Sequence, residues 1–311
     1  MGAAFDLLVL GDVNPDLVLR GGDVVPAFGQ AEHEVDEAVL TVGGSGAIMA
    51  CAAARLGMSV VLCGVIGDDL FGRFLCEELE RRGVDTRGIV TRPTHPTGVT
   101  VVLSGEDDRA ILTMPGTIGE LHGDLIDRAL LEDARHTHVS SYFLQRRLQP
   151  DLPAIFELVH GAEGTTSIDP NWDPTERWDG GLIEALGSTD VFLPNAVEAT
   201  RVAHISDVAE AISRLREHTP TVVVKRGDLG ATAGSDDEHA NVPGLTVPVA
   251  DTTGAGDSFD AGFLAAWLDG RPLEASLRLA VASGALSTRA SGGVDGQPTR
   301  DEAEALAGAP V

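Results

Sequence analysis

Basic residues are scarce in this chain of 311 residues, which has 22 lysines and arginines against 48 aspartates and glutamates. Lys225 is the sole lysine, and the formal net charge is −26. A protein that binds nucleic acid needs a basic surface to neutralise phosphates, so the composition argues against nucleic acid as a partner. The same negative field repels anionic substrates. A nucleotide pocket would therefore need Mg²⁺ or backbone dipoles to offset the charge locally.

Signatures of several other protein classes are missing as well. The three cysteines, Cys51, Cys63 and Cys76, lie in apolar or helical-looking stretches, and neither CxxC nor HxxxH spacing occurs. We therefore expect buried thiols and no disulfide or metal site. The sequence has no Walker A motif and no Gly-x-Ser-x-Gly elbow. It also has no apolar run of membrane-spanning length and no signal-peptide pattern, which predicts a cytoplasmic protein without a membrane partner.

The chain does contain a regular alternation of short apolar runs and amphipathic stretches. Strands are predicted at Phe5–Leu10, Val60–Cys63, His136–Ser140, Thr165–Ile168, Val191–Leu193 and Thr221–Val224. Helices are expected between most of them and, near the end of the chain, at Phe259–Leu268 and Leu273–Arg289. This pattern predicts a single α/β domain over residues 1–311, with a doubly wound, mostly parallel sheet and helices on both faces.

Two segments depart from this alternation, at about residues 12–41 and 98–113. Both read as short strands without a long helix. We expect them to form a small β-sheet that extends from the main domain and acts as a lid.

The stretch Asp251–Phe263 is the strongest candidate for chemistry, because a glycine-rich turn runs directly into an apolar helix. Gly254 and Gly256 permit a tight turn that points several N–H groups one way, and the helix adds unpaired donors and the positive end of its dipole. This arrangement suits an anion. Asp257 lies beside it, which favours a proton acceptor next to a phosphoryl group. The alternative is an ordinary glycine turn with an aspartate in the first helical turn.

Polar residues also follow the predicted strands at their carboxyl ends, where open α/β sheets bind ligands. Asn195 and Glu198 would share the first turn of a helix and suit a hydrated Mg²⁺, or Asn195 is a simple N-cap. Lys225 and Gly227 follow a buried strand at the edge where a nucleotide can bind. The alternative is that Lys225 is only a solvated residue at the end of a strand. The other polar groups of this kind are Asp12, Asn14, Asp16, Ser140, Ser141, Tyr142 and Asp169–Asn171. The sequence Asn14–Asp16 is also typical of an ordinary turn. However, polar residues follow several strands at the same edge of the predicted sheet, and this agreement predicts the rim of an active site.

With these motifs in place, the chain resembles the ribokinase-like (PfkB) family of small-molecule kinases over nearly its whole length. Asp251–Phe263 matches the C-terminal signature of that family, and Gly43–Gly57 matches its N-terminal signature. Supporting matches follow in family order at Gly11–Asp16, Gly64–Gly72, Thr97–Gly98, Asp169–Asn171, Asn195–Glu198 and Gly227.

The resemblance implies ATP-dependent phosphorylation of a hydroxymethyl group on a sugar or nucleoside. Asp257 would be the general base, and the N–H groups of Gly254, Ala255, Gly256 and Asp257 would stabilise the transferring phosphoryl group. Family positions for the acceptor are matched by Asn14, Asp16, Gly43 and Gly44. Those for the nucleotide are matched by Asn195, Lys225, Gly227, Gly254 and Gly256. The family positions that bind Mg²⁺ and its waters are matched by Asn195 and Glu198. The positions that bind K⁺ are matched by Asp251 and Thr253. Family members commonly dimerise through the lid, which implies a homodimer.

Three departures from the family pattern bear on the substrate. Ser45 and Ile48 stand where many ribokinase-type sequences have Lys and Asn, which removes a hydroxyl ligand and argues against ribose itself. The arginine that often follows the Asp-Pro-Asn segment is absent, which weakens the case for a charged acceptor. Val281 replaces a polar residue often found near the adenine.

Three functions remain open on the sequence alone. A carbohydrate kinase is the primary expectation. A nucleoside kinase on the same scaffold is the second, because apolar Ile48 and aromatic Tyr142 and Phe143 would suit a base. A non-catalytic sugar or nucleotide sensor is the third, and the intact Asp257 and glycine turn argue against it.

Overall fold

The main body of the protein is a nine-stranded sheet, seen here in a computed structural model that describes residues 3–21, 24, 28–105, 109–236 and 238–308. In spatial order its strands are β13 (Glu238–Val242), β12 (Ala231–Ser235), β11 (Thr221–Lys225), β10 (Val191–Phe192), β9 (Thr165–Ile168), β8 (Ala134–Val139), β1 (Phe5–Leu10), β4 (Val60–Gly67) and β5 (Val84–Arg92). From β11 to β5 neighbouring strands run parallel, whereas β12 and β13 are antiparallel.

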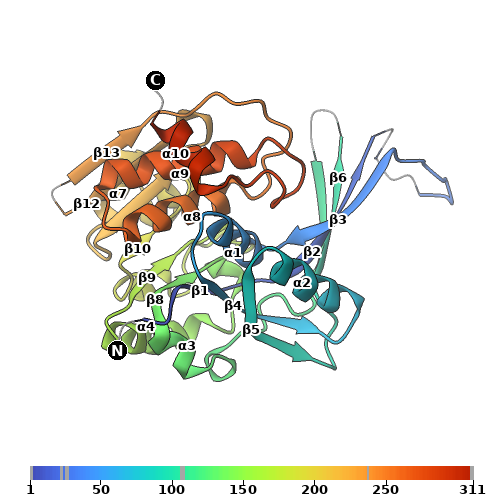
Figure 1. Cartoon of the computed structure of the whole chain (residues 1–311), viewed down its shortest axis with the longest axis horizontal. Helices are drawn as coiled ribbons and strands as arrows, with labels where there is room; N and C mark the ends of the chain where they lie inside the picture. The colour runs from blue at the N-terminus through green and yellow to red at the C-terminus, as the bar shows by residue number, and fades with distance from the viewer. Residues whose placement is uncertain (1–2, 22–23, 25–27, 106–108, 237, 309–311) are drawn as a thin grey trace.

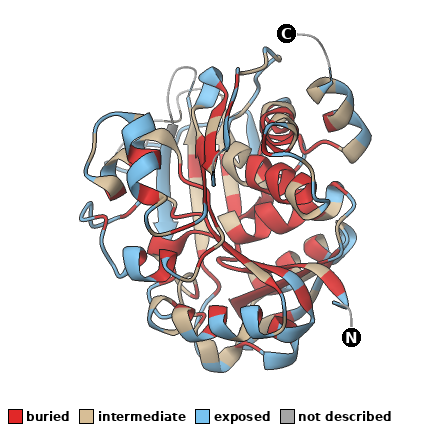
Figure 2. Cartoon of the chain, turned by 90° about the vertical axis from the view of Figure 1, so that its left-hand side faces the viewer, coloured by how far each residue is buried: buried red, intermediate tan, exposed pale blue. Residues whose placement is uncertain are grey.

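Helices cover both faces of this sheet, which confirms the doubly wound fold (Figure 1). One hydrophobic cluster contains α1 (Ser45–Arg55), α2 (Leu70–Arg81), α8 (Ala255–Leu268), α9 (Leu273–Ser287) and α10 (Arg300–Ala307). The other contains α3 (Arg128–Asp133), α4 (Leu152–Gly161), α5 (Leu182–Leu186), α6 (Ala196–Ala203) and α7 (Val208–Leu215). Buried residues fill the space between the layers (Figure 2).

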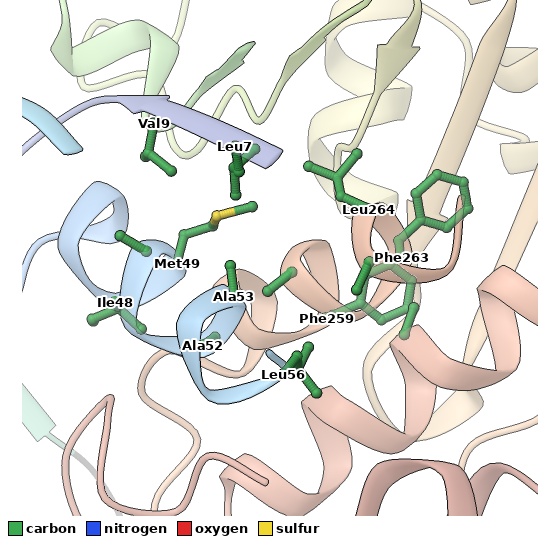
Figure 3. Close-up of a cluster of buried hydrophobic side chains, with 14 of the residues drawn as sticks. Leu7, Val9, Ile48, Met49, Ala52, Ala53, Leu56, Phe259, Phe263 and Leu264 are labelled. Atoms are coloured by element: carbon green, nitrogen blue, oxygen red, sulfur yellow. The ribbon is translucent and has the colours of Figure 1, made fainter. Parts of the chain in front are cut away.

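The central strand β1 contributes to both clusters because its side chains alternate between the two faces. Leu7 and Val9 join the cluster of α1 and α8, whereas Leu8 and Leu10 join the opposite one, and all four are fully buried. A continuous apolar run is what a parallel strand covered on both sides requires. Figure 3 shows Leu7 and Val9 above Met49 of α1, with helix α8 alongside. This packing places the N-termini of α1 and α8 at the same edge of the sheet.

A second sheet confirms the expected small lid. It has four strands in the order β3 (Glu37–Gly43), β2 (Asn14–Arg20), β6 (Val99–Ser104) and β7 (Arg109–Met114). The strands project away from the main body (Figure 1). Parts of the predicted lid segments, residues 22–23, 25–27 and 106–108, lie outside the described residues.

The structure differs from the sequence prediction in two places. Helix α8 begins at Ala255, four residues before the predicted start, so Asp257 lies inside its first turn. The strands β5, β12 and β13 were not predicted. The exposed side chains of the edge strands β5 and β13 and the small side chains of the inner strand β12 give no apolar run.

Two of the three cysteines and two histidines lie inside the core. Cys51 and Cys63 are buried free thiols, and Cys76 is half-buried. His136 and His138 are fully buried, and each has a ring nitrogen 2.7 Å from the hydroxyl of Ser167. Burial lowers the pKa of His138 to about 4, so this ring is neutral at physiological pH. Among the described residues, no helix is long and apolar enough to cross a membrane.

Candidate active site

The four residues predicted to bind the acceptor lie together where the lid meets the main sheet. Asn14 and Asp16 are buried at the start of β2, and the amide of Asn14 donates to the carboxylate of Asp16 at 3.2 Å. Asn14 pairs with Gly43 across the antiparallel ladder. A Cβ on Gly43 would lie 2.1 Å from Asp16 Oδ1, and a Cβ on Gly44 would lie 2.8 Å from Asn14 Oδ1. The two glycines therefore leave the room that these polar side chains occupy.

The turn predicted to form the anion hole lies at the N-terminus of helix α8. Gly254 caps its N-terminus in the left-handed conformation, with φ of 72°, which a residue with a side chain rarely adopts. The first helical turn contains Ala255, Gly256 and Asp257, whose N–H groups have no partner within the helix. These donors and the helix dipole favour negative charge at the turn.

Asp257 lies partly buried in that turn, next to a hydroxyl from helix α1. Ser45 Oγ donates a hydrogen bond to Asp257 Oδ1. Burial and the nearby charge of Asp169 raise the pKa of Asp257 to about 7, while the bond from Ser45 and the charge of Lys225 act against the rise. A carboxylate with a pKa near the working pH is suited to act as a general base.

Ser45 itself is fixed by the buried carboxylate of Asp12, which follows β1. Asp12 accepts from the N–H groups of Ser45 and Gly46, each at 3.1 Å, and so caps the N-terminus of α1. Sequence analysis identified Ser45 only as a departure from the family pattern and gave it no role. A contact with Asp257, 212 positions away, leaves no local signal in the sequence.

Lys225 connects the sheet to helix α8 directly behind the anion hole. Its Nζ lies 2.8 Å from Asp169 Oδ2 and 2.9 Å from Asp260 Oδ2, and the three side chains are only 12%, 8% and 1% exposed. A Cβ on Gly256 would lie 3.8 Å from the same Nζ. The sole lysine of the chain therefore places its charge next to the glycine turn.

The charges around Lys225 are strongly coupled. Burial alone would lower the pKa of Lys225, but the carboxylates beside it raise that pKa above its usual range. Burial works to raise the pKa of Asp169, and the ammonium of Lys225 outweighs it, so the pKa of Asp169 lies below its ordinary value. For Asp260 burial prevails, and its pKa is raised well above the usual range. Sequence analysis missed Asp260, although it lies one helical turn after Asp257.

Asn195 and Glu198 form a capping box at the start of α6, so the N-cap interpretation holds for this pair. Asn195 Oδ1 accepts from the N–H of Glu198 at 2.9 Å, and Glu198 Oε2 accepts from the N–H of Asn195 at 2.8 Å. Burial and the charge of Asp169 raise the pKa of Glu198 to about 7. A divalent cation would relieve this concentration of carboxylates.

In the part of the chain that the structure describes, no group of three or more His, Cys, Asp and Glu side chains could hold a metal ion. Mg²⁺ keeps most of its waters in such a setting, so Asn195 and Glu198 fit contact through water.

A cavity of about 470 Å³ opens beside the glycine turn at the start of α8, and no residue of the lid strands is among those that line it. Lys225 and Gly227 line it at one end, and Gly256 lines it at the turn. Its apolar wall is made by Leu245, Val247, Val249, Phe259, Val281 and Ala285. This volume and lining suit a nucleotide base and ribose.

The carboxylate of Asp251 is held by donors from three segments. Oδ1 accepts from the N–H and the hydroxyl of Thr253, at 2.9 and 2.8 Å. Oδ2 accepts from the N–H of Gly292 and from Nη2 of Arg20, both at 3.0 Å. Sequence analysis did not identify Arg20, which lies 231 positions from Asp251.

Known proteins resemble this chain over nearly its whole length. A family model for pfkB family carbohydrate kinases matches residues 4–300. The chain belongs to that family. An ATP-dependent ribose-1-phosphate kinase of Halopiger xanaduensis is 33% identical over 302 residues, which cover 96% of this chain and 97% of that protein. The ribokinase of Bacillus subtilis is 27% identical over 304 residues, covering 97% and 99%.

Solved structures give the same result for this PfkB-family protein. A putative ribokinase II from E. coli in complex with ATP and Mg²⁺ superposes with a TM-score of 0.85 at 26% identity, covering 97% of this chain and 98% of that one. The protein therefore has the ribokinase fold and is a phosphotransferase.

We expect Lys225→Met to lower the free energy of unfolding by about 3–5 kcal/mol, because it leaves buried carboxylates without their cation. Urea unfolding followed by circular dichroism measures the change. The control is Arg278→Met, which removes the cation of an exposed pair with Glu274 and should cost less than about 1 kcal/mol. Equal costs for the two variants would show that the buried interaction does not stabilise the fold.

Proposed function

We propose that this PfkB-family kinase transfers the γ-phosphoryl group of ATP to a hydroxymethyl group of a small sugar or sugar derivative. The observation that supports it most is the position of Asp257. Its carboxylate contacts Ser45 next to the Gly43–Gly44 turn, and Gly256, its neighbour, lines the nucleotide cavity. The proposed base therefore lies between an acceptor site and a nucleotide site.

In the proposed reaction Asp257 accepts the proton of the acceptor hydroxyl as its oxygen bonds to the γ-phosphorus. The bond between that phosphorus and the bridging oxygen of ADP breaks, and the N–H groups of Gly254 to Asp257 stabilise charge on the transferring group. Lys225 adds a positive charge behind the turn. Mg²⁺ bound with the nucleotide would neutralise phosphate charge, and Asn195 and Glu198 would hold its waters.

A sugar acceptor is favoured over a nucleoside by two observations. Tyr142 and Phe143, the aromatic residues suited to a base, are buried, and the hydroxyl of Tyr142 donates to the carbonyl of Gly180. Ile48 is buried against Gly254 and Gly293. None of the three forms an open wall for a purine. Asn14 and Asp16 supply instead the amide and carboxylate that bind sugar hydroxyls.

A screen of acceptors by ADP release tests the proposed function. We expect turnover with Mg²⁺–ATP and a sugar, and ribose 1-phosphate and ribose are tried first, since they are the acceptors named by the two relatives above. Fructose, sugar acids and nucleosides complete the panel. Turnover of nucleosides alone would contradict the carbohydrate assignment, and ATP binding without turnover of any acceptor would favour a sensor.

Replacement of the base tests the mechanism. We expect Asp257→Asn to lower kcat by roughly 10²- to 10⁴-fold while ATP binding, measured by calorimetry, is retained. In the wild type kcat/KM should fall as the pH drops below about 7, because the carboxylate must be deprotonated to accept the proton. Ser258→Ala is the control, since the neighbouring Ser258 hydroxyl is buried and has no hydrogen-bond partner among the described residues. Near-normal turnover of Asp257→Asn would rule out the general-base role.

We also propose a homodimer that forms through the lid. Ile111 and Leu112, adjacent on the edge strand β7, are 55% and 60% exposed. Consecutive strand residues point to opposite faces, so both faces of this edge carry apolar side chains that a second lid would cover. Light scattering should give twice the chain mass of 32.4 kDa, and Leu112→Asp should give the single mass. A monomeric wild type would contradict the dimer.

A further inference from the structure

Arg20 joins the lid to the loops that flank the anion hole. It is the last residue of β2, and its side chain is 22% exposed. Its Nη2 lies 3.0 Å from Asp251 Oδ2, and its Nη1 donates to the hydroxyl of Ser291. One guanidinium therefore contacts the segment that leads into Gly254 and the segment that follows α9.

These contacts decide whether Asp251 can hold the monovalent cation that the family resemblance implies. An ionised carboxylate offers about four lone-pair sites. Within the described residues Asp251 receives at least four hydrogen bonds, from the N–H and hydroxyl of Thr253, the N–H of Gly292 and the guanidinium of Arg20. A cation at this carboxylate would have to displace a donor and would lie against the positive charge of Arg20. The residues present do not fit K⁺ at Asp251.

We propose that the guanidinium of Arg20 takes the place of a monovalent cation, so that this kinase works without K⁺. The inference rests on the proposed kinase function. Arg20 supplies the same charge at the same carboxylate, but as part of the chain.

The position of Arg20 explains how it would serve phosphoryl transfer. Asp251 lies three residues before Gly254, and the backbone of Gly293 lies so close to Gly254 that an added Cβ would be 2.9 Å from the carbonyl oxygen of Gly293. Arg20 binds Asp251 on one of these segments and Ser291 on the other. It thereby fixes both walls of the glycine turn and offsets the charge of Asp251 beside a site for phosphate.

The first experiment compares the wild type in KCl, NaCl and choline chloride at a constant ionic strength of about 0.1 M. We expect the thermal midpoint to be the same in all three salts. The rate of ADP release with an acceptor found in the screen should likewise be the same. The thermal midpoint needs no acceptor, so it tests Arg20 even if the kinase assay fails.

Variants of Arg20 give the complementary result. Arg20→Met removes one of the two donors to Asp251 Oδ2, and we expect K⁺, but not choline, to raise its thermal midpoint and its turnover. The gain in turnover should be roughly tenfold, the effect of one charge-assisted hydrogen bond. Arg20→Lys keeps the charge and should remain indifferent to K⁺. Arg135→Met is the matched control, because it removes an arginine paired with Asp6 near the amino end of β1.

Two outcomes would overturn the proposal. One is a rise in the thermal midpoint or turnover of the wild type with K⁺ over choline. The other is a folded Arg20→Met protein that responds to K⁺ no more than Arg135→Met does. If Arg20→Met does not fold, the wild type and Arg20→Lys test the proposal. Stimulation of either protein by K⁺ would contradict the replacement of the monovalent cation by the side chain at position 20.

Discussion

The buried contact of Lys225 with Asp169 and Asp260 is the interaction on which the rest of the site depends. Asp169 follows β9, Lys225 ends β11, and Asp260 lies one turn into α8, so one ammonium group joins two strands to the helix. Buried charges are costly unless they are paired, and breaking such a set leaves an uncompensated charge. The N-terminus of α8 is therefore held at one position over the sheet, and Gly254, Gly256 and Asp257 are held with it.

The distribution of charge in the site follows from the composition of the chain. A protein with a net charge of −26 must bind a nucleotide that is itself an anion. Positive groups are gathered around the glycine turn at the start of α8. They are the N–H groups of the first turn of α8, the ammonium of Lys225 behind it and the guanidinium of Arg20 beside Asp251. Burial, together with repulsion from Asp169, raises the pKa of Asp257 to about 7, a range that suits a general base. The acidity of the chain is thus part of the chemistry.

The fold and part of the site could be predicted from the sequence, because they depend on residues that are close together in the chain. The apolar run of β1 and the regular spacing of strands and helices identified the fold, because each depends on neighbouring residues. Gly254, Gly256 and Asp257 were predicted together because a turn and the helix after it are continuous in the chain. The family resemblance grouped Asn14, Asp16, Gly43 and Gly44, and the antiparallel pairing of β2 with β3 places Asn14 opposite Gly43.

The remaining contacts could not be predicted because they join distant parts of the chain. Ser45 and Asp257 are 212 positions apart, and Arg20 and Asp251 are 231 apart. Nothing near Arg20 distinguishes it from other arginines at strand ends. The antiparallel strands β12 and β13 were missed for a different reason, since their polar and small residues do not form an apolar pattern. In this protein the local sequence pattern predicts most strands and helices. Which polar side chains contact one another is decided by how those elements pack.

Lys225 has one more consequence, which concerns covalent chemistry at amines. Acetylating enzymes, glycating sugars and amine-directed crosslinkers all attack a neutral, accessible lysine side chain. This chain offers one such side chain, and it is protonated, almost enclosed and engaged by two carboxylates. Modification of Lys225 therefore requires that its ammonium first loses a proton and leaves the two carboxylates. The fold therefore protects the sole lysine of the chain from reagents that modify lysine side chains.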